Sequence, residues 1–400
     1  MIFEGIKVSD YPFDELTVQG IFLHNHNWDV YRALHNSSLR DEVVSEVAKM
    51  LSCRDDECGF VEYYCEYCGE SRTVYFGCNS RICSRCGKPH SDNWARTIAS
   101  SMYDVPHRHA VLSLPDRMWD MFRDNWDLLK VLMDSVMETL DNVMNFKTRE
   151  DIEPGAVVIL HPFSRDVSFK PHVHILMIEG GFTKKGRFKR KGRISYEAMR
   201  KVWQYTILTN LKKALPPTPE NSQFIADLFK RYPMGFYAHL PKESTIWNRR
   251  QISKYLGRYI RHPAIANFRL VGYDGRSVCY WYKDNDDNKH YKTVGVFEFI
   301  EMLIQHIPKK HFKMVRHYGA YSRRSKSKYR RYVSQESLAQ KKLDDFSKKP
   351  PWICPKCQST MVIVRFRKKP PPDPIGFGGR VEDWQVISKR GLAQEILLTK

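Results

Sequence analysis

The stretch "KPHVHILMIEGG", Lys170 to Gly181, places two histidines on either side of one valine, ahead of an apolar run that two glycines end. Side chains on a strand alternate between faces, so we expect His172 and His174 to point the same way while Val173 and Ile175 point into a core. Two imidazoles on one face can chelate a single divalent ion. An isolated pair of this kind is more often structural, so the rest of the chain decides its interpretation.

The segments around this strand predict an α+β domain on a mainly antiparallel sheet. Residues 107–115 predict a strand closed by proline, and 155–163 a buried strand that a short connection returns as a hairpin into the histidine strand. Apolar residues recur at helical spacing at Leu129, Leu132, Val136, Leu140 and Val143. Further predicted elements are a helix over 195–215, a strand over 235–240 and a hairpin over 268–284 that turns at Asp274 and Gly275. Strands adjacent in sequence, with helices inserted between them, are typical of α+β folds.

The composition indicates a folded protein that acts on nucleic acid. The chain has 400 residues, 42% of them hydrophobic, which can bury a sizeable core and favours more than one domain. Its formal charge of +20, from 65 basic and 45 acidic residues, favours a polyanionic partner. The sequence starts without a basic stretch and an apolar block, and no apolar run approaches the ~20 residues that span a bilayer. We therefore expect a cytoplasmic, nucleoid-associated protein with no membrane partner.

Two basic runs concentrate the positive charge. "KKGRFKRKGR", 184–193, has seven cations in ten residues, and "YSRRSKSKYRRY", 321–332, places six cations between tyrosines. Cations that hold phosphates, interleaved with aromatic rings that stack on bases, are typical of single-stranded nucleic-acid binding. Solvated loops are the alternative. The DNA-binding residues predicted here are Lys184, Lys185, Arg187, Lys189, Arg190, Lys191, Arg323 and Arg324.

The cysteines predict a zinc module near the N-terminus. Seven of the ten lie between Cys53 and Cys86. They include two CxxC motifs, Cys65 with Cys68 and Cys83 with Cys86, separated by 14 residues. Two such motifs present four thiolates, and Zn²⁺ takes four in a tetrahedron. Disulfides are the poorer explanation in a chain without an export signal.

The remaining cysteines leave the number of zinc ions open. A second ion could take its ligands from Cys58, Cys78 and either Cys53 or His90. Cys354 and Cys357 in "WICPKCQST" form half a site, so they either recruit ligands from elsewhere or are plain thiols. A module this small mainly replaces a hydrophobic core, so the role of its zinc would be structural.

A second motif lies in "NRRQISKYLGRYIRHP", residues 248–263. Its apolar residues recur every four positions, at Ile252, Leu256 and Ile260, which predicts a helix packed against the sheet. Tyr255 and Tyr259 have the same spacing, so their hydroxyls would project from one face. Tyrosines on a helix usually serve packing. On the flank opposite the apolar stripe lie two cations that we expect to attract phosphate, Lys254 and Arg258.

Five motifs in this order resemble the two-tyrosine rolling-circle transposases of bacterial insertion sequences, which are HUH endonucleases related to Helitron transposases. They are the histidine–hydrophobic–histidine strand, "YLGRY", "CNSRICSRC", "LSLP" and "VRHYGAYSRR". The resemblance runs from about residue 50 to residue 330. It implies an HUH endonuclease core with helices flanking the antiparallel sheet.

The resemblance also implies a reaction. Mg²⁺ or Mn²⁺ on His172 and His174 would polarise the scissile phosphate of single-stranded DNA, and Tyr255 or Tyr259 would attack it, leaving a 5′-phosphotyrosine. The partners would be the single-stranded ends of a mobile element and its target. Such hard ions need further ligands besides two imidazoles. The first candidate is Gln251, one turn before Tyr255, and the second is His161.

We expect three regions. Residues 1–100 would form an N-terminal helical and zinc-binding DNA-binding region, 101–345 the HUH nuclease and strand-transferase domain, and 346–400 a C-terminal CPKC segment with a loose tail. A replication initiator or a relaxase would share the nuclease core, but the sequence has no GxxxxGK[ST] motif for an added helicase. A non-catalytic zinc DNA-binding protein and a zinc hydrolase are the remaining alternatives. The hydrolase is disfavoured because no Asp or His follows His174 closely.

Overall fold

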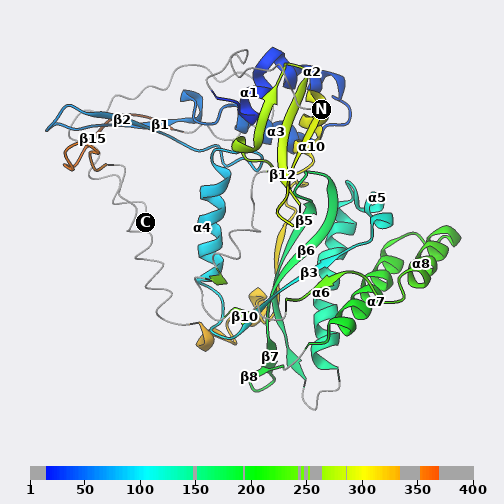
Figure 1. Cartoon of the computed structure of the whole chain (residues 1–400). Coiled ribbons are helices and arrows are strands. Elements are labelled where there is room, and N and C mark those ends of the chain that lie inside the picture. The colour runs from blue at the N-terminus through cyan, green and yellow to red at the C-terminus, as the bar shows by residue number, and fades with distance from the viewer. Residues whose placement is uncertain are drawn as a thin grey trace.

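The computed structural model describes residues 15–146, 151–191, 194–241, 245–246, 251–252, 264–284, 286–333 and 352–368. Figure 1 shows a central sheet with long helices on one side, a cap of N-terminal helices at one end of the molecule and a narrow arm beside the cap. The N-terminal helices and the arm lie at the same end, whereas β7 and β8 lie at the other.

The central sheet has the strand order β10-β3-β6-β5-β14, with β9 paired to β3, and every pairing is antiparallel. The β5–β6 hairpin supplies its middle and confirms the predicted return of the chain into the histidine strand. The strands are β3 (His107–Ser113), β5 (Gly155–Phe163), β6 (Phe169–Ile178), β9 (Ala238–His239), β10 (Thr245–Ile246) and β14 (Val315–Gly319).

Long helices cover one face of this sheet. Val173 and Ile175 on β6 are fully buried against them, as predicted from the alternation of the strand. The five apolar residues at helical spacing all lie buried on α6, whose first turn is capped by the side chain of Asn125. Among the described helices, none combines the length and the apolar character that a bilayer crossing requires. This layer contains η4 (Asp116–Met118), α5 (Trp119–Phe122), α6 (Trp126–Asn145), α7 (Tyr196–Ala214) and α8 (Pro219–Arg231).

The opposite face carries a second apolar cluster. It joins Val157 and Ile159 of β5 and Leu176 and Ile178 of β6 to residues of α4 and of the segment after β14. At the end of β6 a small sheet closes this side, and Gly180 is required there because a Cβ would lie 2.1 Å from the carbonyl oxygen of Lys189. The elements are α4 (Gly87–Ala99), β4 (Ile152–Glu153), β7 (Gly180–Thr183), β8 (Phe188–Arg190), α11 (Arg323–Lys326) and η6 (Arg330–Tyr332).

The N-terminal helices share a core with a segment more than 200 residues later. Ile21, Phe22 and Val47 belong to the same buried cluster as Tyr280 and Ile300. The division of the chain at residue 100 stays a prediction, and this core joins residues from both sides of it. The elements are α1 (Val18–Leu23), η2 (His24–His26), α2 (Asn27–Leu34), α3 (Asp41–Leu51), η5 (Asn267–Arg269), β11 (Leu270–Tyr273), β12 (Ser277–Lys283), β13 (Lys289–Gly295) and α10 (Val296–Ile304).

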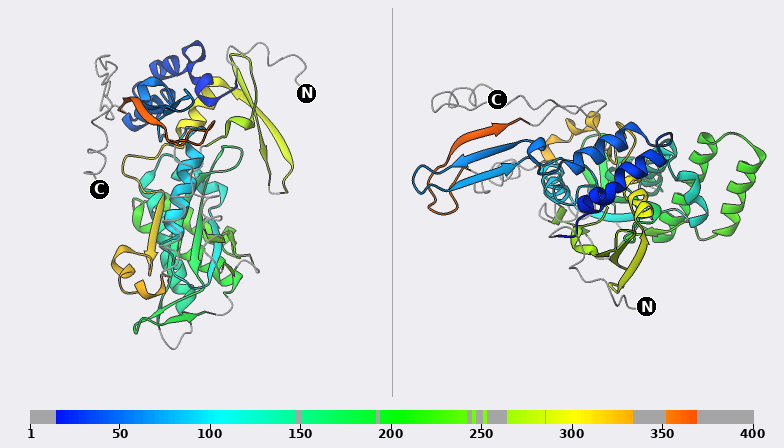
Figure 2. Two further views of the ribbon diagram at one scale, coloured as in Figure 1. Left: turned by 90° about the vertical axis from the view of Figure 1, so that its left-hand side faces the viewer. Right: turned by 90° about the horizontal axis from the view of Figure 1, so that it is seen from above.

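The arm is a three-stranded sheet of order β15-β1-β2 that projects sideways from the cap (Figure 2). It pairs β1 and β2, which lie near the N-terminus, with β15 from the C-terminal segment. The arm and its connection contain η3 (Asp56–Cys58), β1 (Phe60–Tyr64), β2 (Ser71–Tyr75) and β15 (Val362–Arg367).

Candidate functional site

Three histidines meet on the sheet face opposite the long helices. One ring nitrogen from each of His161, His172 and His174 lies within 4.8 Å of the others. His161 on β5 is paired directly with His172 on β6, and His174 follows two residues later, so all three side chains leave the same face. The ring centroids are 5.5 Å apart for His161–His172, 4.5 Å for His161–His174 and 5.1 Å for His172–His174. The predicted common face of the histidine pair is confirmed, and a third imidazole joins it.

Hydrogen bonds orient the two histidines of β6. His172 donates from Nδ1 to the carbonyl oxygen of Lys170 at 2.7 Å, which leaves its Nε2 lone pair available for a metal ion. His174 Nδ1 lies 3.2 Å from Nε2 of His109 on β3, and the two rings are stacked with 5.5 Å between centroids. His109 was not identified from the sequence, although "HRH" at 107–109 has the same spacing as the pair on β6.

Burial keeps these rings uncharged. It lowers the pKa of His172, and together with the neighbouring imidazoles it lowers the pKa of His174 well below the ordinary value. It also lowers the pKa of His109 to about 4. At neutral pH His172 and His174 are therefore neutral, which is the form that binds a metal ion. His161 and His172 are partly exposed while His174 is buried, so the cluster opens toward solvent.

The third-ligand prediction named Gln251 first and His161 second. The side chain found with the pair is His161, from the neighbouring strand of the hairpin. Gln251 is exposed and helical, and its ligand role stays a prediction. Three imidazole nitrogens suit a transition-metal ion better than Mg²⁺, which prefers oxygen ligands and retains its water. Of the two ions predicted, this donor set favours Mn²⁺.

The predicted nucleophiles, Tyr255 and Tyr259, lie outside the described residues, as do Lys254 and Arg258. The residue that precedes them in the described chain, Ile252, is 2% exposed and belongs to the apolar cluster that contains Ile159 and Leu176.

Alternation along the two strands relates this cluster to the histidines. Ile159 is two residues before His161 on β5, and Leu176 two residues after His174 on β6, so these four side chains share a face. The chain therefore enters the tyrosine segment on the histidine face of the sheet, and the predicted packing of Ile252 against the sheet is confirmed.

One cluster of four cysteines lies in the cap. The sulfur atoms of Cys53, Cys78, Cys83 and Cys86 all lie within 4.8 Å of one another. The Sγ–Sγ distances are 3.2 Å for Cys78–Cys86, 3.4 Å for Cys83–Cys53 and 3.9 Å for Cys53–Cys86. These separations are too long for disulfides and suit four thiolates around Zn²⁺.

The prediction that the two CxxC motifs share one ion is wrong. Cys83 and Cys86 belong to the cluster in the cap, whereas Cys65 and Cys68 lie with Cys354 and Cys357 in the arm. The reason is topological, because β1 and β2 carry the turn with Cys65 and Cys68 away from the start of α4. Cys58 is buried in the apolar core of the cap. It belongs to neither of the cysteine groups found among the described residues.

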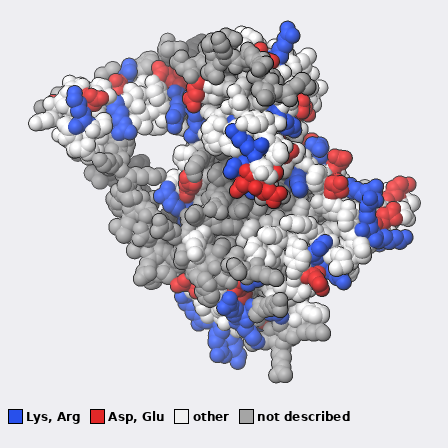
Figure 3. All heavy atoms as spheres, in the orientation of Figure 1, with Lys and Arg blue, Asp and Glu red and all other residues white. Residues whose placement is uncertain are grey.

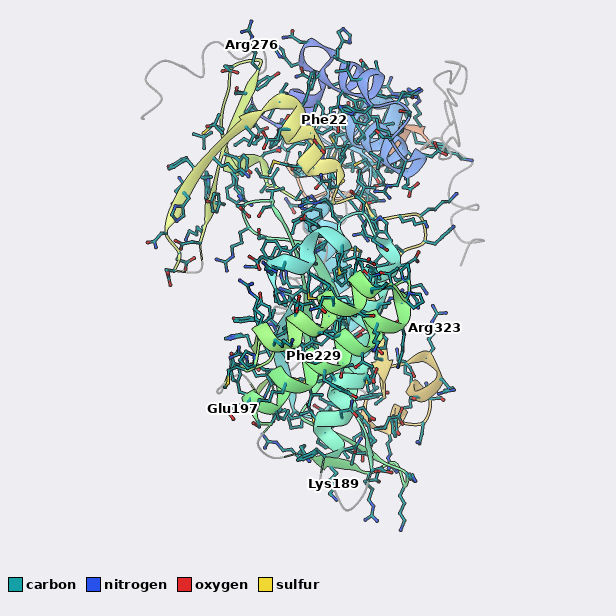
Figure 4. The ribbon with its side chains drawn as sticks, turned by 90° about the vertical axis from the view of Figure 1, so that its right-hand side faces the viewer. Phe22, Lys189, Glu197, Phe229, Arg276 and Arg323 are labelled. Carbon is teal, nitrogen blue, oxygen red and sulfur yellow. The ribbon has the colours of Figure 1, made fainter. Side chains whose placement is uncertain are left out.

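The two basic runs form one surface at the far end of the sheet. Arg331 donates to the carbonyl oxygen of Gly186, and Tyr332 accepts a hydrogen bond from the N–H of Phe188 at 3.1 Å. Figure 3 shows Lys and Arg gathered at this end of the molecule, and in Figure 4 the side chain of Lys189 projects from it. We call this surface the basic patch. Its exposed predicted cations are Lys184, Lys185, Arg187, Lys189, Arg190, Arg323 and Arg324.

Two of its tyrosines pack inside the protein, so the expectation that they are available to stack on bases is wrong. Tyr321 is 4% exposed, stacks on Tyr103 and hydrogen-bonds through its hydroxyl to His107. Tyr329 is fully buried, stacks on Phe182 and donates to Glu153 at 2.6 Å. These aromatic side chains anchor the basic segment to the sheet.

Arg190 differs from the other cations of the basic patch. It donates to Oε2 of Glu179 at 2.7 Å, and that carboxylate, whose side chain is 3% exposed, also pairs with Arg108 at 2.6 Å. The single charge of this buried carboxylate is shared between two arginines, so part of the charge of Arg190 is neutralised. Lys191 is partly exposed and donates to the carbonyl oxygen of Phe146 at 3.3 Å.

Two family models match the chain. The model described as "Transposase zinc-binding domain" matches residues 23–114, which contain the cysteine cluster of the cap. The model described as "Putative transposase" matches residues 155–328, which contain the three histidines and the tyrosine segment. The zinc-binding match precedes the transposase match along the chain, as the cysteine motifs precede the histidine and tyrosine motifs.

Two relatives are similar over most of their length. The "Transposase for insertion sequence element IS801" of Pseudomonas savastanoi pv. phaseolicola is 28% identical over 326 residues, which cover 78% of each chain. The "Putative transposase y4qJ" of Sinorhizobium fredii is 26% identical over 314 residues, or 73% of this chain and 77% of the other. No solved structure matches the chain.

Proposed function

Because this chain is similar over most of its length to transposases of bacterial insertion sequences, we propose that it is an HUH transposase that cuts and rejoins single-stranded DNA through a 5′-phosphotyrosine formed by Tyr255 or Tyr259. The reaction would take place at His161, His172 and His174. The ends of a mobile element and its target would be the DNA substrates. The geometry of the three histidines supports a metal-dependent nuclease over a non-catalytic zinc DNA-binding protein, because binding alone would not require them.

The single observation that carries the proposal is the position of Ile252. It packs on the sheet face that bears the three histidines, and Tyr255 and Tyr259 follow it by three and seven residues. The periodicity of the segment predicts a helix, in which residues three and four apart share a face. A helix that starts on this face can bring a phenol to a phosphate bound at the histidines.

The residues then have distinct roles. A divalent ion held by the three imidazoles would supply a Lewis acid for the scissile phosphate. The tyrosine oxygen forms a bond to phosphorus and loses its proton to solvent. The bond from phosphorus to the 3′ oxygen breaks, and that oxygen takes up a proton to become a free 3′-hydroxyl. An unassisted phenol has a pKa of about 10 and is a poor nucleophile at neutral pH. The reaction therefore depends on the Lewis acid at the scissile phosphate.

Strand joining is the same reaction in reverse. The energy of the phosphodiester is kept in the phosphotyrosine bond, so a 3′-hydroxyl can attack it and release the tyrosine without ATP. Two tyrosines allow two strand ends to be held at once, which suits exchange between donor and target.

The basic patch supports DNA as the substrate. It begins beyond Ile178, at least about 13 Å along the strand from His174 at ~3.3 Å per residue. DNA that reaches the histidines would therefore contact the patch several nucleotides from the cleavage point. We assign this contact a role in holding the strand and none in the chemistry.

The proposal is tested by trapping the covalent adduct. The protein is incubated with end-labelled single strands from a matching element and Mn²⁺, and the linked peptide is identified by mass spectrometry. We expect the link on residue 255 or 259, and its loss in the double variant Tyr255→Phe, Tyr259→Phe with DNA binding retained. Tyr205→Phe, which removes an exposed hydroxyl on α7, is the matched control. An adduct that persists in the double variant would place the nucleophile elsewhere.

A further inference from the structure

Four cysteines from distant parts of the chain meet in the arm. Cys65 and Cys68 lie in the turn between β1 and β2, and Cys354 and Cys357 lie in the turn before β15, with all four sulfur atoms within 4.8 Å of one another. We propose that these thiolates hold a second structural Zn²⁺ ion, which docks the C-terminal segment onto the β1–β2 hairpin. The matched zinc-binding region ends at residue 114 and does not reach Cys354 or Cys357.

The two turns have the same backbone geometry. In each, the N–H of the first cysteine, Cys65 or Cys354, donates to the carbonyl oxygen five residues later at 2.8 Å. The carbonyl oxygen of that cysteine accepts the N–H from four residues later, at 2.9 Å and 3.0 Å respectively. The residue in this fourth position has a positive φ in both turns, 73° at Gly69 and 62° at Gln358. Two unrelated segments thus fold into matching turns, each of which presents its two sulfur atoms to the other.

The sulfur separations distinguish a metal site from disulfides. Cys65 Sγ is 3.4 Å from Cys357 Sγ, and Cys68 Sγ is 3.6 Å from Cys354 Sγ. A disulfide requires about 2.05 Å. Four sulfurs bound to Zn²⁺ at about 2.3 Å in a tetrahedron lie about 3.8 Å apart. Both separations are slightly shorter than the zinc geometry requires and far longer than a disulfide, so small shifts of the side chains are enough to complete a zinc site.

The arm has a small apolar core. Its buried cluster contains Tyr63, Cys65, Cys354 and Met361, so half of it consists of the proposed ligands. The pairing of β1 with β15 fixes a segment that lies almost 300 positions later in the chain, since Cys65 and Cys357 are 292 positions apart. Ordering such a segment costs conformational entropy that a few apolar contacts do not offset. Metal binding supplies folding free energy to small domains of this kind.

The arm site is separate from the cysteine cluster of the cap. The cap cysteines Cys53, Cys78 and Cys83 lie within the large apolar core shared with α10 and β12, whereas the arm has its own cluster. Loss of the arm ion would therefore release the C-terminal segment while the cap stays folded. The inference is also independent of the proposed chemistry, since it concerns neither the histidines nor the tyrosines.

Zinc counting on the full-length protein tests the inference. The protein is purified without added metal, and bound zinc is measured by mass spectrometry and by release to a chromogenic chelator. Because the three histidines can also bind Zn²⁺, the counts are made with His161→Ala and His172→Ala in every protein. In this background we expect two Zn²⁺ per chain, and one per chain when Cys354→Ser and Cys357→Ser are added. The matched control is Cys279→Ser on β12, whose cysteine belongs to neither cluster and which should retain two ions.

A second variant protects the result against simple misfolding. Zn²⁺ also accepts imidazole nitrogen, so Cys357→His should bind two ions while Cys357→Ser binds one. Cobalt substitution should show the ligand-field bands of tetrahedral thiolate coordination, with weaker intensity in the double serine variant. Limited proteolysis should cut before β15 in that variant and leave the cap intact.

With the histidine site removed, two ions retained after the two serine substitutions would overturn the inference, as would one ion per chain before them with the cap cluster occupied. A disulfide between Cys65 and Cys357 in protein purified under reducing conditions would overturn it as well. A protein with two zinc ions but without a DNA adduct would disprove the proposed function and leave the arm site intact.

Discussion

His109 Nε2 lies 3.2 Å from Nδ1 of His174, the more buried histidine of the pair on β6. The neighbouring strand β3 therefore supplies a partner to one ring nitrogen of His174, and the other ring nitrogen is the one that could hold a metal ion. His172 receives the same support from the carbonyl oxygen of Lys170. Partners of this kind fix the tautomer and orientation of a ligand, and their loss weakens metal binding without removing a ligand.

We expect His109→Ala to weaken Mn²⁺ binding by about 10–100-fold, because His174 loses the group that orients it. His109→Gln should recover part of the affinity, since its amide can reach the position of Nε2. Both values are measured by calorimetric titration of the protein with Mn²⁺. Equal melting temperatures would show that the effect is on orientation. Unchanged affinity in the alanine variant would contradict a positioning role for His109.

His161→Ala should affect the site more than His109→Ala, because it removes a donor nitrogen. We expect Mn²⁺ affinity to fall by more than the ~100-fold upper range of an orienting partner, with adduct formation falling in parallel. His290→Ala on β13, an exposed histidine paired with Asp284, is the control and should leave both values unchanged. If His161→Ala binds Mn²⁺ normally while Gln251→Ala does not, Gln251 is the third ligand.

The basic patch should determine how DNA binding depends on salt. Each neutralised phosphate of a single strand contributes about 0.7 to the slope of log affinity against log salt. Replacing Lys184, Lys185 and Lys189 with alanine should therefore lower the slope by about 2 if each contacts a phosphate. The matched control replaces three exposed lysines at the ends of α7 and α8, Lys212, Lys213 and Lys230. An equal fall in both variants would mean that overall charge, and not this surface, determines binding.

Local patterns in the sequence predicted the elements of the central sheet. The alternation of residues 170–178 and the helical spacing from Leu129 to Val143 each report burial of one face, and local geometry decides that property. His161 was only the second candidate for the third ligand, because its distance from the histidine pair depends on the pairing register of β5 and β6. Pairing with His172 across the β5–β6 hairpin brings it to the histidine face, and the sequence does not state that register.

The grouping of the cysteines could not be predicted for a similar reason. A CxxC spacing identifies a turn that presents two thiolates but does not identify the other turn. Cys65 and Cys83 are 18 residues apart and lie in different clusters, whereas Cys65 and Cys357 are 292 residues apart and meet. Likewise, the cations around Tyr321 and Tyr329 suggested an exposed run, but tertiary packing directs both rings into the protein.

His306 follows α10 and is not one of the proposed metal ligands. Its ring stacks on Phe163 with 3.7 Å between centroids, and its Nδ1 donates to the carbonyl oxygen of Met302 at 2.9 Å. Burial lowers the pKa of His306 to about 4. An unfolded chain has a histidine pKa of about 6.5, so between these two values the unfolded state binds a proton that the native state does not.

Protonation of His306 therefore favours the unfolded state. The free energy of unfolding should fall as the pH is lowered below about 6.5, by up to about 1.4 kcal/mol per pH unit for this one group, and should not change above it. His306→Phe keeps a stacked ring without a titrating nitrogen. Urea unfolding of the wild-type protein and the variant, from about pH 7.5 down to about pH 4.5, isolates this histidine because all others titrate in both. We expect the stability of the wild-type protein relative to the variant to decrease through this window. Parallel pH profiles would mean that His306 is protonated in the folded protein as easily as in the unfolded chain.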